Sequence, residues 1–123
     1  MPGIEQQIIR GLGMRVRYPY RSTLMGGFDF VYVFTADGML IKPTYKERSR
    51  TGRHGDDIYE LSNGIYYVVW YTRPNGHNRP IYVKYMRLVI DAGGAHSEEI
   101  REEDLPQAVA VKARAIFNRL MGQ

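Results

Sequence analysis

Alternation of apolar and basic side chains over residues 14–21 predicts a β-strand near the start of the chain. Successive side chains of a strand point to opposite faces, so the apolar residues would face a core and the arginines would face solvent. The apolar face of this predicted strand carries Met14, Val16, Tyr18 and Tyr20.

The same reading of the sequence predicts a series of six antiparallel strands. They cover residues 14–21, 28–34, 39–47, 58–61, 65–72 and 81–90. Asp37-Gly38 and residues 62–64 have the composition of hairpin turns, and residues 74–78 form a further predicted turn. Pro43 has no amide hydrogen for a sheet ladder, so we place its strand at an edge or a bulge. The last strand is long enough to serve two neighbours or to bend around a barrel corner.

Both ends of the chain are predicted to be helical. Residues 104–121 begin with a sequence that resembles a capping box, and they carry one apolar stripe at helical spacing. The stripe consists of Leu105, Val109, Ala113, Ile116 and Leu120. This amphipathic helix would pack on the sheet or plug one end of a barrel. Ile4 and Ile8 lie one helical turn apart and indicate a short N-terminal helix.

These elements predict a mainly β, single-domain protein over residues 1–123. A chain of 123 residues is long enough for one hydrophobic core and too short for two ordinary domains. Six strands in a meander would close or nearly close into a barrel over about residues 14–91. The interior of such a barrel is either packed solid or holds one small ligand.

Composition narrows the classes of function. The absence of cysteine excludes a disulfide framework, thiolate metal ligands and a cysteine nucleophile. The three histidines, which all lie in predicted Gly-rich turns at spacings unsuited to a metal site, are His54, His77 and His96. No apolar stretch approaches the length that crosses a bilayer, and the first 13 residues lack the order of a secretory signal. We therefore expect a cytoplasmic protein with neither a metal nor a membrane partner.

Aromatic residues supply the candidate binding site. Ten of the aromatic side chains are tyrosine, against four phenylalanines and a single tryptophan, Trp70. If Trp70 faces inward, the alternation of its strand turns Tyr66, Val68 and Thr72 inward with it, towards Tyr18 and Tyr20. The predicted ligand-binding residues are Tyr66, Val68, Trp70, Thr72, Phe30 and Tyr32. Rings and hydroxyls of this kind suit an aromatic, partly polar molecule, although the same side chains could simply fill the core.

Four pieces of the chain occur in a familiar order: Tyr18-Pro19-Tyr20, the aromatic strand 28–34, Gly52-Arg53, and the run 61–70. In this order and spacing the chain from about residue 13 to residue 91 resembles the calycin-like barrels of the phenolic acid decarboxylases and of the molybdenum-cofactor biosynthesis protein F family. The resemblance implies a β-barrel with a central cavity, often dimeric, that needs no metal or organic cofactor.

The resemblance also assigns roles to individual residues. Tyr18 and Tyr20 match the pair of tyrosines that holds the substrate carboxylate in the decarboxylases, and Arg53 matches an arginine of the group that acts on the substrate's para-hydroxyl. These three residues are the predicted catalytic residues. The acid/base glutamate of the decarboxylases would stand at position 72, where this chain has threonine. A hydroxyl of ordinary pKa is a poor general base. The resemblance therefore supports the predicted fold more strongly than it supports decarboxylation.

Three hypotheses of function follow. The first is a small-molecule-binding barrel for an aromatic or carboxylated ligand, with cofactor-free lyase or isomerase chemistry as its enzymatic form. The second is a module that binds nucleic acid or an acidic protein through the basic loop 42–53 and exposed tyrosines, consistent with the net charge of +4. The third is an interaction subunit with a plugged barrel that forms a homodimer through the sheet edge at Pro43 or the apolar helix face.

Overall fold

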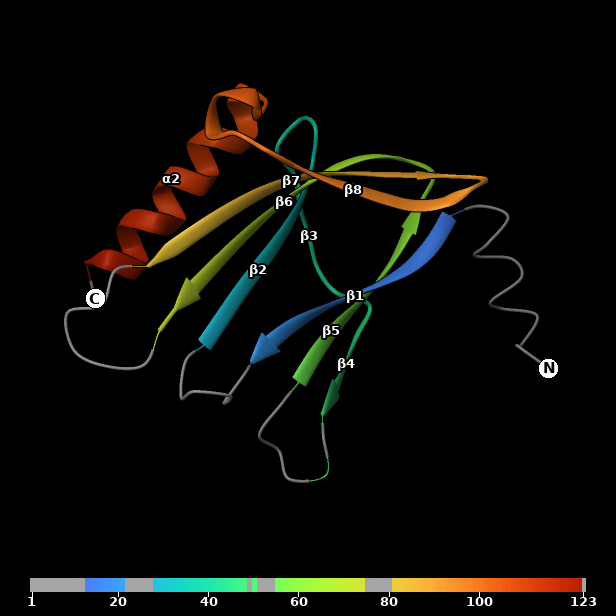
Figure 1. The fold of residues 1–123 in the computed structure, drawn as a ribbon, viewed down its shortest axis with the longest axis horizontal. Coiled ribbons are helices and arrows are strands. Elements are labelled where there is room, and N and C mark those ends of the chain that lie inside the picture. Colours follow the sequence, from blue (N-terminus) through green and yellow to red (C-terminus); the bar gives the residue numbers. More distant parts are fainter. Residues whose placement is uncertain (1–12, 22–27, 49, 51–54, 75–80, 123) are drawn as a thin grey trace.

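The computed structural model describes residues 13–21, 28–48, 50, 55–74 and 81–122, which form two antiparallel β-sheets and one long helix (Figure 1). The smaller sheet has the strand order β1-β5-β4, with β1 at Gly13–Arg21, β5 at Gly55–Ser62 and β4 at Tyr45–Arg48. The larger sheet has the order β3-β2-β6-β7-β8. Its strands are β3 (Leu40–Ile41), β2 (Phe28–Thr35), β6 (Gly64–Arg73), β7 (Tyr82–Asp91) and β8 (Gly94–Ile100).

The mainly β class is confirmed, and the prediction of a closed barrel is wrong for the described strands. The eight strands form two separate hydrogen-bonded ladders, so no single ladder runs around the molecule. The two sheets instead bury an apolar interior between them. Consecutive strands change sheet three times: between β1 and β2, between β3 and β4, and between β5 and β6.

Pro43 marks the crossing between β3 and β4. The predicted third strand, residues 39–47, is divided into β3, which is an edge strand of the larger sheet, and β4, which is an edge strand of the smaller sheet. Proline cannot donate to a ladder, so pairing stops there. It resumes at Thr44, whose backbone N–H donates to the carbonyl of Ile58 at 2.7 Å. The Asp37-Gly38 turn between β2 and β3 is confirmed, with Gly38 at a φ of 87°.

Asn63 marks the crossing between β5 and β6, and the hairpin predicted there is wrong. β5 pairs with β1 and β4, whereas β6 pairs with β2 and β7, so the two strands diverge from Asn63 into different sheets. The hydroxyl of Tyr66 donates to the carbonyl of Ser62 at 2.9 Å across this corner. A hairpin and a corner place the same apolar alternation on both flanking strands, so the pattern alone does not distinguish them.

β8 is a strand that the sequence pattern did not predict. It pairs with β7, which serves two neighbours as expected, through a turn at residues 91–94. Five consecutive residues of β8, from Ala95 to Glu99, are exposed, so this edge strand lacks the apolar alternation that reveals a buried strand. His96 lies in β8 opposite Val89, not in a turn as predicted.

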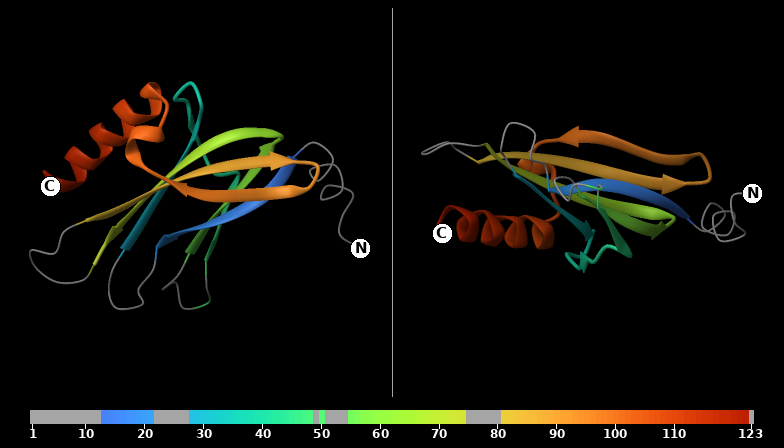
Figure 2. Two further views of the ribbon diagram at one scale, coloured as in Figure 1. Left: turned by 45° about the horizontal axis from the view of Figure 1, so that its top comes forward. Right: turned by 90° about the horizontal axis from the view of Figure 1, so that it is seen from below.

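The C-terminal helix α2 (Gln107–Met121) covers the outer face of the larger sheet (Figure 2). The five residues of the predicted stripe all pack against that face, which confirms the stripe. The helix begins at Gln107, after a short 3-10 turn at Glu102–Asp104, and not at residue 104. The hydroxyl of Tyr71 in β6 donates to the carbonyl of Ala113 at 2.7 Å and so links sheet and helix.

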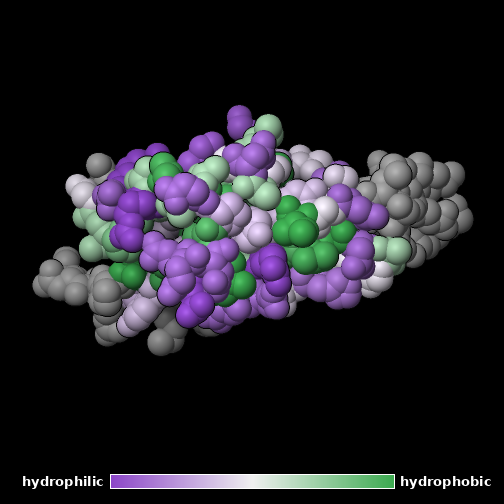
Figure 3. All heavy atoms as spheres, turned by 90° about the horizontal axis from the view of Figure 1, so that it is seen from above, coloured by the Kyte–Doolittle hydropathy of each residue, from purple (hydrophilic) through white to green (hydrophobic). Residues whose placement is uncertain are grey.

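The described residues therefore contain two apolar cores, one between the sheets and one between the larger sheet and α2. Polar residues cover much of the face in Figure 3, with apolar residues in smaller patches. No helix within the described ranges is long and apolar enough to cross a membrane. The predicted N-terminal helix lies outside the described residues.

Candidate ligand-binding groove

β6 arranges its inward-facing side chains as the alternation predicts. Tyr66 and Val68 are buried between the two sheets, and Trp70 is half-buried at the margin of the same interior. Thr72 continues this face and is also half-buried. The interior thus opens towards solvent along β6 from Val68 to Thr72.

Tyr18 meets Trp70 from the smaller sheet, as predicted, but the two rings are in packing contact. Their centroids lie 6.0 Å apart with the planes at 88°, and Tyr59 packs against Tyr18 at 6.0 Å in a similar edge-on arrangement. Burial raises the pKa of the Tyr18 hydroxyl, and a hydrogen bond with Ser97 opposes that shift. Tyr18 is therefore a neutral phenol at neutral pH, placed behind Trp70.

The remaining predicted site residues do not join this group. Phe30 and Tyr32 lie on the opposite face of β2 and pack in the core beneath α2, so their prediction as neighbours of Trp70 is wrong. Tyr32 contacts Tyr71 at a centroid distance of 5.8 Å. One-residue alternation explains the error, because residues 29 and 31 of β2 are the ones that face Trp70. The side chain of Tyr20 and all of Arg53 lie outside the described residues.

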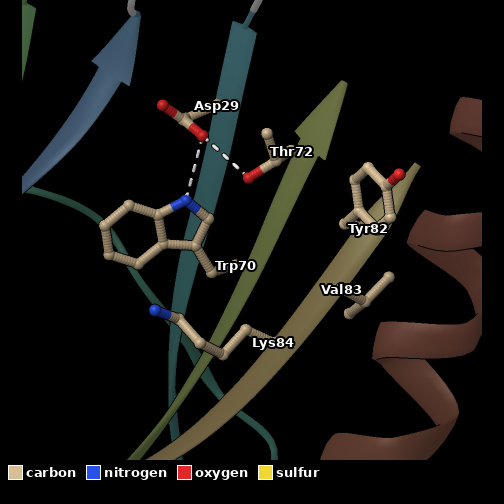
Figure 4. Close-up of a pocket in the computed structure, with 6 residues that line it drawn as sticks. All are labelled: Asp29, Trp70, Thr72, Tyr82, Val83 and Lys84. Carbon is tan, nitrogen blue, oxygen red and sulfur yellow. Dashed lines mark hydrogen bonds between the residues drawn. The ribbon is translucent and has the colours of Figure 1, made fainter. Parts of the chain in front are cut away.

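A groove of about 340 Å³ opens beside Trp70 on the larger sheet (Figure 4). Three adjacent strands form it, because Thr72 is paired with both Asp29 of β2 and Tyr82 of β7, and Trp70 is paired with Lys84 of β7. The six lining residues are Asp29, Trp70, Thr72, Tyr82, Val83 and Lys84.

Asp29 holds the indole of Trp70 in place. Its Oδ1 accepts a hydrogen bond from Trp70 Nε1 at 3.0 Å and a second from Thr72 Oγ1 at 2.9 Å. Hydrogen bonds to a carboxylate are stronger than those between neutral groups, so they fix both the ring and the hydroxyl. Trp70 therefore presents its ring to the groove in one defined orientation.

Lys84 supplies the positive charge of the groove. Its Nζ lies over the Trp70 ring, 5.0 Å from the ring centroid, which is a cation–π contact. The side chain is exposed, and among the described residues no carboxylate forms an ion pair with it. The groove thus combines one ammonium, one carboxylate and one immobilised indole, a set that can orient a small aromatic molecule carrying charge.

Sequence reasoning did not identify Asp29, Tyr82 or Lys84. Asp29 has a usable signal, because it is a lone carboxylate between two phenylalanines in a strand that otherwise reads as apolar or aromatic. Its partner could not be deduced, because the sequence does not give the register between β2 and β6. That register places Asp29 opposite Thr72. That position is the one where the resemblance to the decarboxylases calls for glutamate.

One of the four described basic residues of the segment 42–53, Lys46, forms an ion pair within the described part of the molecule. Lys46 Nζ lies 2.6 Å from Asp57 of the adjacent β5, and Arg17 of β1 bridges both Glu47 and Asp56. Acidic residues therefore lie among Lys46 and Arg17, whereas Lys42, Arg48 and Arg50 form no ion pair among the described residues, and the nucleic-acid hypothesis stays a prediction.

A second hollow, of about 140 Å³, lies where β1 meets the β7–β8 turn. It is lined by Gly13, Met14 and residues 91–94. Asp91 accepts a hydrogen bond from the backbone of Gly93 at 2.8 Å and lies 3.2 Å from His96 Nε2, so its carboxylate stabilises the turn. Within the described residues no three histidine, aspartate or glutamate side chains are grouped to hold a metal ion.

The fold and groove define a mainly β protein of two stacked antiparallel sheets with one covering helix and a small polar-aromatic groove. Comparisons with known proteins found no matching family model, no matching curated protein and no matching solved structure. The groove itself is therefore the evidence for its function.

Proposed function

We propose that this chain binds a small aromatic or carboxylated molecule in the groove beside Trp70. The observation that carries the proposal is the indole fixed by Asp29 with the ammonium of Lys84 over its ring. A volume of about 340 Å³ falls in the range of small-molecule pockets. An aromatic ligand would pack against Trp70, and its acid group would pair with Lys84.

The chemistry of the lining supports a ligand of this class over a fatty acid. Three of the six lining side chains are charged or hydroxylic beside the indole, and Tyr82 adds an exposed phenol at the rim. A long alkyl chain would leave these polar groups unpaired, whereas a compact aromatic acid can satisfy them.

Cofactor-free lyase or isomerase chemistry is the enzymatic form of this proposal. If the protein catalyses a reaction of its ligand, Asp29 is the group best placed to move a proton, because it stands opposite Thr72 and its carboxylate borders the groove. Tyr18 would then act behind Trp70 by positioning the ring, because its phenol is buried and engaged with Ser97.

A ligand titration followed by tryptophan fluorescence tests the binding proposal. Trp70 is the single tryptophan of the chain, so every change in indole emission reports on this groove. We expect aromatic carboxylates to change the emission in a saturable way. The Lys84→Gln variant should bind aromatic carboxylates about two- to fivefold more weakly, which is the contribution of one exposed charge pair.

Lys42→Gln is the matched control, because Lys42 is also exposed but lies outside the groove lining. It should leave the affinity unchanged. Equal losses in the two variants would indicate a nonspecific effect of net charge and would contradict the proposal. A salt titration with an oligonucleotide distinguishes the nucleic-acid hypothesis, which requires binding at low ionic strength that falls steeply with salt.

A further inference from the structure

We propose that the ligand of the groove carries a cationic nitrogen as well as an acid, so that it is a zwitterionic aromatic molecule. This inference rests on the proposed function and specifies the class of ligand. It comes from the unused half of the Asp29 carboxylate and from the place of Lys84 relative to it.

Asp29 uses only one of its two oxygens within the described part of the molecule. Both Trp70 Nε1 and Thr72 Oγ1 donate to Oδ1. In Figure 4 the second oxygen points away from both donors. The side chain is half-buried, and Oδ2 is not among the buried polar atoms that lack a partner, so it is open to solvent or to a ligand. A carboxylate oxygen accepts hydrogen bonds only, so its partner must be a donor.

Lys84 presents the opposite chemistry on the other side of the indole. Figure 4 shows Asp29 by the pyrrole nitrogen of Trp70 and the ammonium of Lys84 near the six-membered ring. The groove therefore offers an acceptor beside the indole N–H and a donor over the ring of the same indole. A ring with an acid at one end and an ammonium at the other would offer a partner to each of these two charges.

A purely anionic ligand fits this arrangement less well. An acid drawn in by Lys84 enters a groove that also contains the Asp29 carboxylate, and like charges at close range repel. A cationic nitrogen on the same ligand replaces that repulsion with a second charge-assisted hydrogen bond. A bare metal ion is disfavoured for a related reason, because the only carboxylate in the lining is Asp29 and an ammonium lies nearby.

Three probes with the same ring and the same substituent positions test the inference: para-(aminomethyl)benzoate, para-toluate and para-methylbenzylamine. They are the zwitterion, the acid alone and the amine alone. Each is titrated into the wild-type chain and followed by Trp70 emission. We expect the zwitterion to bind about fivefold tighter than the acid, the worth of one further exposed charge pair.

Asp29→Asn is the decisive variant, because asparagine retains an oxygen that can accept from Trp70 and Thr72, while the charge is lost and the second acceptor oxygen becomes an NH2 donor. We expect the zwitterion to bind this variant no more tightly than para-toluate does, while the affinity for para-toluate stays level or rises. An unchanged preference for the zwitterion in Asp29→Asn would overturn the inference, as would equal affinities of acid and zwitterion for the wild type.

The wild-type comparison needs no variant, so the inference can be refuted even if Asp29→Asn does not fold. The outcomes also separate the two proposals. Binding of para-toluate without preference for the zwitterion removes this inference and leaves the proposed function standing. Failure of all three probes to bind the folded wild-type chain removes both.

Discussion

Individual side chains determine what the groove can bind. Asp29 stands in an aromatic strand, where a carboxylate is stable because two donors from β6 satisfy its Oδ1. Thr72 is one of those donors, so it supports a carboxylate from the neighbouring strand.

The Thr72 hydroxyl contributes to stability through this bond. Thr72→Val keeps the shape of the side chain and removes the donor, and we expect it to lower the free energy of unfolding by about 1 kcal/mol. Thr72→Ser keeps the hydroxyl and should lose clearly less. Urea unfolding of the three proteins measures the difference. A valine variant as stable as the wild type would show that the bond to Asp29 contributes nothing.

Some helices and strands could be predicted from the sequence, and others could not. The stripe of α2 and the alternation of β1 and β6 were readable, because burial on one face leaves a periodic apolar pattern. β8 was not, because an exposed edge strand has no such pattern. The prediction of a hairpin at Asn63 was wrong, because β5 and β6 pair with strands that are distant in the sequence. The local sequence around Asn63 does not show which strands those are.

The residues of the candidate site were likewise predicted in part. Trp70, Thr72 and Tyr18 were predicted to lie near one another from the alternation of their own strands, and they do. Phe30 and Tyr32 were assigned to the wrong face, and Asp29 and Lys84 were missed. Both errors concern the register of β2 and β7 against β6, which the sequence of a single chain does not specify.

Helix α2 stabilises the larger sheet through its buried stripe, and one pair of valines tests this directly. Val109 is fully buried against the sheet, whereas Val111 is 57% exposed on the other side of the same helix. Val109→Ala should lower the free energy of unfolding by about 2 kcal/mol through lost burial and a residual cavity. Val111→Ala should change it by only a few tenths of a kcal/mol. Similar losses at both positions would contradict this packing.

At the scale of the whole molecule, buried phenols connect stability to pH. Burial is the main cause that raises the pKa of Tyr18, Tyr59 and Tyr71 above the ordinary 10.0, and the nearby charge of Asp57 adds to the shift at Tyr59. In the unfolded chain these phenols ionise near pH 10, while the folded protein keeps them protonated. Their contribution is therefore complete below pH 10 and is lost as the pH rises further.

We accordingly expect the unfolding midpoint in urea to fall steadily above pH 10. Phenolate absorbance should show Tyr18, Tyr59 and Tyr71 ionising only on unfolding. Tyr82→Phe serves as the control, because Tyr82 is 61% exposed and its removal should leave the pH dependence of stability unchanged. Early ionisation of every tyrosine without loss of the fold would mean that the interior between the sheets is open to water.

The two sheets, the helix and the groove together lead to one claim: a small aromatic acid binds against Trp70. The indole N–H of Trp70 is the most direct reporter, because the chain has one tryptophan and this N–H donates to Asp29 at the groove. In a two-dimensional ¹H–¹⁵N spectrum, its single indole signal should move saturably as para-(aminomethyl)benzoate or para-toluate is added, together with the backbone signals of Thr72 and Lys84. An indole signal that stays in place at saturating concentrations of both compounds, in a folded protein, would contradict the claim.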